Sequence, residues 1–274
     1  MRSRFQLAAT GVAAAALLLG AAGCTKLRAR DNLNKGVQAF KSAKYAEAAE
    51  FFQKACDLDP EFPTARLYLA TAYMSQYIPG AQSEENLSMA RRAHDEFMKV
   101  LEKSPNDAVA LASIASLYYH QKKFDEAEEW YKKVIAADPN NKEAYYTLGV
   151  IAWGRTFPKR MEARAKLSMK PEDPGPIKDK KVREEIAAAN MPLVEEGLKN
   201  LEAALKIDPE YDDAMAYMNL LHRERADLQE SAEAYKKDTE AADGWVQKTL
   251  ETKKIKAARA EAKTGGGIVL DDSK

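Results

Sequence analysis

Residues 107–139 read DAVALASIASLYYHQKKFDEAEEWYKKVIAADP. The first half carries Ile114, Leu117 and Tyr118 at helical spacing, and the second half is another amphipathic stretch that ends at Asp138-Pro139. One pair of such helices cannot bury its own apolar face, so similar pairs must stack beside it. The stretch therefore predicts an all-α fold made of helix pairs.

Comparable segments recur along the chain, and each closes on a proline. Asp-Pro stands at residues 59–60, 138–139 and 208–209, with Ser104-Pro105 as a variant. The spacing from Pro105 to Pro139 is 34 residues, from Pro60 to Pro105 it is 45, and from Pro139 to Pro209 it is 70. A fixed period of this length indicates a repeat architecture in which the longer spacings hold additional residues.

The pattern resembles the tetratricopeptide repeat over roughly residues 30–240. The small and large positions of that family fall on Gly36, Ala48, Phe52, Ala55 and Pro60, and again on Ala127, Tyr131, Val134, Pro139, Leu148 and Gly149. Lys35 departs from the leucine expected before Gly36. The resemblance implies a solenoid of helix-turn-helix units over residues 31–228.

Two segments interrupt the period. Residues 76–86 include Pro79-Gly80 and are predicted to form a loop between paired helices. Residues 155–190 form either an insertion or a degenerate extra helix pair. They hold ten basic and six acidic side chains, which indicates either a solvated face or a contact with an acidic partner or lipid headgroups. Beyond the repeats, residues 229–263 are predicted to form a capping helix and residues 264–274 a flexible tail.

The N-terminus has the layout of a secretory signal. Arg2 and Arg4 precede an apolar run from Leu7 to Leu19, and small residues lead to Cys24. This order resembles the lipobox of bacterial lipoproteins, which implies that residues 1–23 are removed, that Cys24 is lipidated and that residues 24–30 are a linker. The alternatives are a plain cleaved signal and an uncleaved anchor, although the apolar run is shorter than the roughly 20 residues of a membrane span.

The charge balance bears on the class of partner, and the second cysteine bears on the core. Removing residues 1–23 takes away two basic and no acidic residues, which leaves 40 basic and 42 acidic side chains and a net charge of −2. This balance does not predict nucleic-acid binding. Cys56 lies in an apolar helical stripe with Phe52 and Ala55, so we expect it in the core.

No motif for catalysis, metal binding or cofactor binding stands out. His94, His120 and His222 are scattered without zinc-ligand spacing, and the sequence has neither a P-loop nor a nucleophile elbow. We therefore predict a non-enzymatic protein with no cofactor, no metal and no small-molecule substrate. An unrecognised envelope enzyme is kept as an alternative.

The tetratricopeptide resemblance implies a concave groove, lined by the first helix of each pair, that binds a protein partner. The groove positions implied are Leu33, Phe40, Leu67, Met74, Tyr119, His120, Tyr146 and Trp153. The Lys and Asn that grip a peptide carboxylate in one class of the family are replaced by Leu33, Val37, Leu67, Thr71, Ala112, Ser116, Tyr146 and Val150. The groove is thus expected to be apolar and aromatic, unless the inserted segment or the C-terminal helix of the chain itself packs against it.

Together these features predict a lipid-anchored scaffold in a bacterial cell envelope. Thr25 follows Cys24, and the absence of Asp at that position favours the outer membrane, with the solenoid facing the periplasm. Resemblance to envelope tetratricopeptide lipoproteins implies a role in outer-membrane protein assembly or in pilus secretin assembly. The alternative scaffold function is regulation of peptidoglycan enzymes.

Overall fold

The computed structural model describes residues 24–170 and 173–264, and these residues form α-helices without strands. The all-α prediction is therefore confirmed for the described part. The chain divides into two compact units, residues 1–130 and 131–274. The predicted signal (residues 1–23) and nearly all of the predicted tail (residues 265–274) lie outside the described residues.

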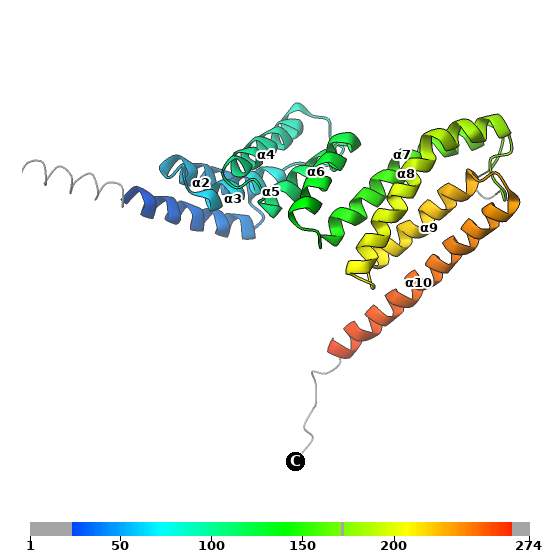
Figure 1. The fold of residues 1–274 in the computed structure, drawn as a ribbon. Helices are drawn as coiled ribbons and strands as arrows, with labels where there is room; N and C mark the ends of the chain where they lie inside the picture. Colours follow the sequence, from blue (N-terminus) through cyan, green and yellow to red (C-terminus); the bar gives the residue numbers. More distant parts are fainter. Residues whose placement is uncertain (1–23, 171–172, 265–274) are drawn as a thin grey trace, which may run out of the picture. The chain divides into compact units, whose positions relative to one another are not determined.

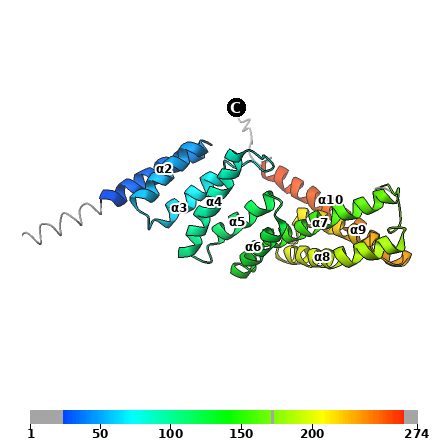
Figure 2. The ribbon, with the colours of Figure 1, turned by 90° about the horizontal axis from the view of Figure 1, so that it is seen from above.

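The N-terminal unit consists of antiparallel helix pairs (Figures 1 and 2). Residues 24–41 are helical and precede α2 (Tyr45–Leu58), so the segment 24–30 that was expected as a linker is helical in the described chain. Next come α3 (Pro63–Met74) with α4 (Glu84–Lys103), and then α5 (Ala108–His120). The helix α6 (Phe124–Ala137) follows and crosses the boundary between the units. Cys56 is buried in this unit, as predicted, and burial raises the pKa of its thiol to about 11.

Local sequence explains where these helices begin. The side chains of Ser83, Asp107, Asn141 and Asp179 each accept a hydrogen bond from a backbone N–H in the first turn that follows. Such N-caps satisfy one of the free amides at a helix start and contribute about 1 kcal/mol each. Helix α3 begins at Pro63. Proline lacks a backbone N–H, which costs nothing in the first turn of a helix because the N–H groups there have no partner within the helix.

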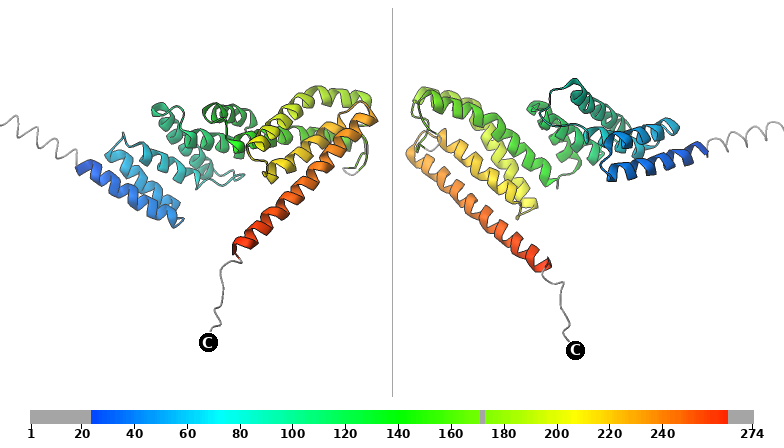
Figure 3. Two further views of the ribbon diagram at one scale, coloured as in Figure 1. Left: turned by 60° about the horizontal axis from the view of Figure 1, so that its bottom comes forward. Right: turned by 180° about the vertical axis from the view of Figure 1, so that it is seen from behind.

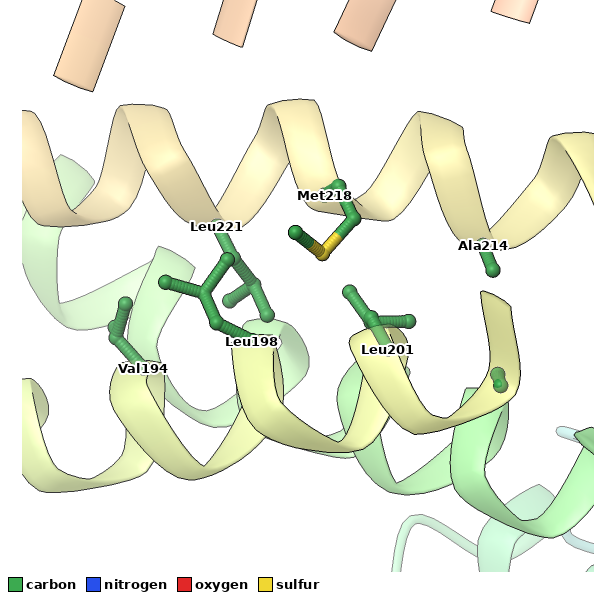
Figure 4. Packing of buried hydrophobic residues seen from close by; sticks show 7 residues of the cluster. Val194, Leu198, Leu201, Ala214, Met218 and Leu221 are labelled. Carbon is green, nitrogen blue, oxygen red and sulfur yellow. The ribbon is translucent and has the colours of Figure 1, made fainter. Parts of the chain in front are cut away.

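The C-terminal unit contains four consecutive helices. They are α7 (Lys142–Lys166), α8 (Lys180–Ile207), α9 (Asp212–Asp227) and α10 (Ala232–Thr264), and they lie side by side in Figures 1 and 3. The core between α8 and α9 is aliphatic. Figure 4 shows Leu198 and Leu201 of α8 facing Met218 and Leu221 of α9.

The irregular segment 155–190 is neither a separate insertion nor an extra helix pair. Its residues lengthen α7 and α8, which remain one pair joined by residues 167–179. Both helices continue through an internal proline, Pro158 and Pro192. The Nδ2 of the buried Asn190 donates to the backbone oxygen of Thr156 at 3.2 Å, which links the two helices close to both prolines.

The C-terminal helix is held to α9 along its length. Near its start, the carboxylate of the buried Asp238 accepts hydrogen bonds from Arg225 at 2.6 Å and from Gln229 at 2.6 Å. Burial opposes ionisation of Asp238, but these bonds outweigh burial and lower the pKa of its carboxyl. Near its end, Arg259 donates to Glu210 at 2.7 Å. The predicted capping segment is thus a helix tied at both ends.

Candidate functional site

The first helices of the pairs carry the predicted groove residues. In the N-terminal unit Leu33, Phe40, Leu67, Met74 and Tyr119 are half-buried in the described chain, which leaves part of each side chain accessible. Apolar side chains that are held in place yet partly exposed are the kind of surface that binds an amphipathic helix or an extended apolar segment.

Neighbouring rings hold the aromatic members of this face. The rings of Phe40 and Tyr45 meet edge to face with centroids 5.0 Å apart. Tyr119 lies 6.3 Å from Phe124, and burial raises the pKa of its hydroxyl. Rings fixed in this way lose little conformational freedom on binding, which is why aromatic residues serve well as anchors.

In the C-terminal unit Tyr146 and Trp153 of α7 are engaged by α9. The Tyr146 ring lies 5.1 Å from the Tyr211 ring and 5.6 Å from the Tyr217 ring. Trp153 meets Tyr217 edge to face at 5.7 Å. Burial, followed by the charge of nearby Glu143, raises the pKa of Tyr211 to about 12. Both predicted residues therefore hold the helices of this unit together as well as presenting a partly exposed edge.

Thr71 and Val150 stand at two of the positions where the predicted groove has neither Lys nor Asn. The hydroxyl of Thr71 donates to the backbone oxygen of Leu67 at 2.8 Å, and Val150 is buried. His120, also predicted for the groove, is exposed and lies beside the connection between α3 and α4, where it lines a cleft with Tyr77.

A buried ionic cluster, not predicted from the sequence, links α7 and α9. Arg164 donates from Nη1 to Asp227 Oδ1 at 2.9 Å, and Arg160 Nε lies 2.9 Å from Glu224 Oε1. Arg160 also bonds Asp227. Arg164, Glu224 and Asp227 are all less than 5% exposed. Arg160 and Arg164 are four residues apart and Glu224 and Asp227 are three apart, so each pair is expected on one face of a helix. Local spacing does not show that these two faces, about 65 residues apart in sequence, pack together.

This cluster accounts for much of the positive charge counted in residues 155–190. Arg160 and Arg164 are neutralised by two acids of α9, which lie outside that segment. Arg183 donates inward to the backbone oxygen of Ile177 at 2.7 Å. The cluster thus offsets two of the four excess positive charges of the segment, while Lys159, Lys166, Lys170, Lys178, Lys180 and Lys181 remain exposed.

Within residues 24–170 and 173–264, no group of three or more His, Cys, Asp or Glu side chains is placed to hold a metal ion. No helix in the same residues is long and apolar enough to cross a membrane.

Comparison with known proteins identifies the repeats. Family models described as "Tetratricopeptide repeat" match residues 32–62 and 88–149. Sperm-associated antigen 1 of Rattus norvegicus is 34% identical over 117 residues, and the mouse protein is 32% identical over the same length. These segments cover 43% of this chain but only 12% of each relative, so the match is confined to a small part of those proteins.

Solved structures agree at the level of the fold. MamA 41-end from Desulfovibrio magneticus RS-1 has a TM-score of 0.55 and 18% identity over 83% of this chain and 96% of its own. YrrB, described as a TPR protein with an unusual peptide-binding site, has a TM-score of 0.50 and 16% identity over 85% of this chain and 90% of its own.

Tetratricopeptide repeats generally act as non-enzymatic scaffolds for protein partners. Two parts of the chain match the repeat models, and the helix pairs have the fold of MamA and YrrB. The protein is therefore an all-helical protein that contains tetratricopeptide repeats, an architecture suited to protein–protein interaction.

Proposed function

We propose that this protein is a lipid-anchored scaffold of the bacterial cell envelope that binds a protein partner through the first helices of its repeats. The observation that supports the proposal is that Leu33, Phe40, Leu67, Met74 and Tyr119, which lie on the first helices of their pairs, are each half-buried. Partly exposed anchors on rigid helices fit an amphipathic helix or an extended apolar segment. Anchoring at the outer membrane would confine the search for that partner to a surface.

Charge near Cys24 supports the membrane part of the proposal. Cys24 is exposed, and Leu27 in the same helical stretch is 70% exposed. Lys26, Arg28 and Arg30 are also exposed and form no ion pair with the described part of the chain. Basic and apolar side chains beside a lipid anchor add to membrane attachment, because they contact anionic headgroups and the interface.

The groove is tested by placing a photo-crosslinking amino acid at Leu67 or at Tyr119 in intact cells. We expect both positions to give the same crosslinked partner, because the two side chains belong to one face. Met98 on α4 is the matched control, since it is 36% exposed but lies on a second helix of a pair. The partner identified by mass spectrometry should be absent at Met98. Equal capture at all three positions, or different partners at Leu67 and Tyr119, would contradict the groove.

The anchor is tested by Cys24→Ala. We expect loss of metabolic labelling by palmitate, together with release into the soluble fraction or accumulation of an uncleaved precursor, because the acylated sulfur is gone. Cys56→Ala is the control, since that thiol is buried and should not affect processing. Unchanged processing and membrane attachment of the Cys24→Ala protein would rule out lipidation at this residue.

A further inference from the structure

The N-terminal unit contains a cleft of about 480 Å³ at one edge of its helix pairs. One side comes from the connection between α3 and α4 and from the beginning of α4, and the other comes from the end of α5 and the turn into α6. The lining residues are Tyr77, Gly80, Gln82, Leu87, Arg91, His120, Gln121, Lys122 and Lys123. The cleft is separate from the first-helix positions Leu33, Phe40 and Leu67.

The wall made by the α3–α4 connection is fixed by one buried side chain. Asn86 is 7% exposed, and its Oδ1 accepts from the backbone N–H of Ile78 at 2.7 Å. Its Nδ2 donates to the backbone oxygens of Ile78 at 2.9 Å and Ala81 at 2.8 Å. This connection belongs to the repeat whose spacing is 45 residues, so the residues added to the period build this side of the cleft.

The opposite wall is an ordered turn. The backbone N–H of Lys122 donates to Tyr119 at 2.9 Å, and that of Lys123 donates to Tyr118 at 3.0 Å. These bonds close the end of α5 and fix the backbone from which both lysine side chains extend.

The charge of the lining residues has one sign. Arg91, Lys122 and Lys123 are cationic, His120 becomes cationic when protonated, and none of the lining residues is acidic. Arg91 does pair with Glu84, but the two side chains are 57% and 83% exposed, so this pair contributes little and can exchange for another carboxylate. Arg91 lies on α4, whereas Lys122 and Lys123 lie on the turn after α5. Cations on two separate elements suit a peptide with several acidic residues better than one compact anion.

Tyr77 adds a hydroxyl donor and an aromatic ring to the cleft. Its side chain is only 9% exposed, it lines the cleft, and its hydroxyl forms no hydrogen bond within the described residues. The ring is held in place by burial, and the hydroxyl is available to donate to a ligand. Beside it, Leu87 supplies an apolar contact.

We propose that this cleft binds an acidic peptide segment of a partner protein. Carboxylates of the segment would pair with Arg91 on one side and with Lys122 and Lys123 on the other. An aliphatic side chain of the segment would contact Leu87 and the Tyr77 ring, and the Tyr77 hydroxyl would donate to a carboxylate or backbone oxygen. The volume lies within the range of sites that hold small ligands. The site is independent of the proposed groove and of the lipid anchor.

The test measures fluorescence anisotropy of a labelled peptide, Leu-Asp-Asp-Leu-Asp, with the purified full-length protein. We expect Lys122→Gln with Lys123→Gln to weaken binding at least tenfold, and Tyr77→Phe to weaken it about threefold, because a charge-assisted pair is stronger than one neutral hydrogen bond. The peptide Leu-Asn-Asn-Leu-Asn should not bind. Far-ultraviolet circular dichroism shows whether each variant is folded.

A matched control uses the corresponding turn of the first repeat. Lys41→Gln with Lys44→Gln removes the same charge from the same unit but lies outside the cleft, so it should leave the affinity unchanged. Leu67→Ala should also leave it unchanged, which separates this cleft from the proposed groove. Equal losses in the two lysine pairs, binding of the Asn peptide, or displacement of the acidic peptide by equimolar inorganic phosphate would overturn the proposal.

Discussion

Replacing Gly197 with valine is expected to lower the free energy of unfolding of the C-terminal unit by about 3 kcal/mol. A β-carbon at this position would lie 2.6 Å from Ala152 Cβ and 2.7 Å from Leu221 Cδ1. Leu221 can change its rotamer, but Ala152 Cβ is fixed to the backbone of α7, so α7 and α8 would have to separate. Urea denaturation gives the loss in stability, and hydrogen exchange of α7 and α8 shows where it arises.

Gly244 is the matched control for this prediction. It also lies within a helix, but no atom is within 4 Å of the position that a β-carbon would take. Gly244→Ala should therefore stabilise by up to about 1 kcal/mol, because alanine favours a helix more than glycine does. Gly197→Ala should be destabilising despite the same gain. If both alanine variants were stabilising, the close approach at Gly197 would not be real.

The same contact shows how far sequence reasoning reached. The 34-residue period and the small residues, Gly149 among them, were enough to predict helix pairs that pack closely. A β-carbon on Gly149 would indeed lie 2.5 Å from Leu201 Cγ. The repeat period in the sequence predicts this close packing because each helix pair contacts the pairs next to it along the chain.

Sequence reasoning stopped where the outcome depended on distant residues. Pro139 and Pro209 are 70 residues apart, and this spacing left residues 155–190 as either an insertion or an extra helix pair. Pro158 and Pro192 are also typical helix breakers. The structure continues both helices through these prolines, and the bond from Asn190 to Thr156 links the two helices nearby. The cleft was likewise foreseen only in part, because the loop at residues 76–86 was predicted but its juxtaposition with Lys122 was not.

The buried ionic cluster leads to the second large effect, since its two acids should respond in opposite ways to removal of their charge. Asp227 bonds Arg164 at 2.9 Å and also bonds Arg160. Asp227→Asn keeps the shape of the side chain but leaves two arginines without their shared counter-charge. Breaking a buried pair in this way costs about 3–5 kcal/mol, so we expect a loss of that size in urea denaturation at both pH 5 and pH 8.

Glu224 differs because burial dominates its ionisation. Its oxygens form no hydrogen bond of good geometry within the described residues, although Arg160 Nε is 2.9 Å away. Burial raises the pKa of Glu224 to about 7. The charge of Arg160 opposes this shift only in part, because Arg160 also bonds Asp227. The negative charge of Asp227 raises the pKa of Glu224 further. Glu224 is thus protonated in the folded protein at pH 5 and ionised at pH 8.

The sign of the resulting pH dependence follows from the order of the two pKa values. The folded-state pKa of about 7 lies above the ordinary value of 4.5, so between these two pH values the folded state holds a proton that the unfolded state has released. The contribution of Glu224 to the free energy of unfolding is therefore largest below pH 4.5 and is lost as the pH rises from 4.5 through 7. The shift corresponds to a loss of about 3 kcal/mol.

Glu224→Gln should remove that loss, because glutamine resembles the protonated acid at every pH. We expect the variant to match the parent protein at pH 5 and to exceed its stability by about 3 kcal/mol at pH 8. Burial lowers the pKa of His222, but His222 is present in both proteins, so its contribution cancels in their difference. A parent protein and variant with parallel pH profiles would show that Glu224 is ionised throughout and that its pair with Arg160 outweighs burial.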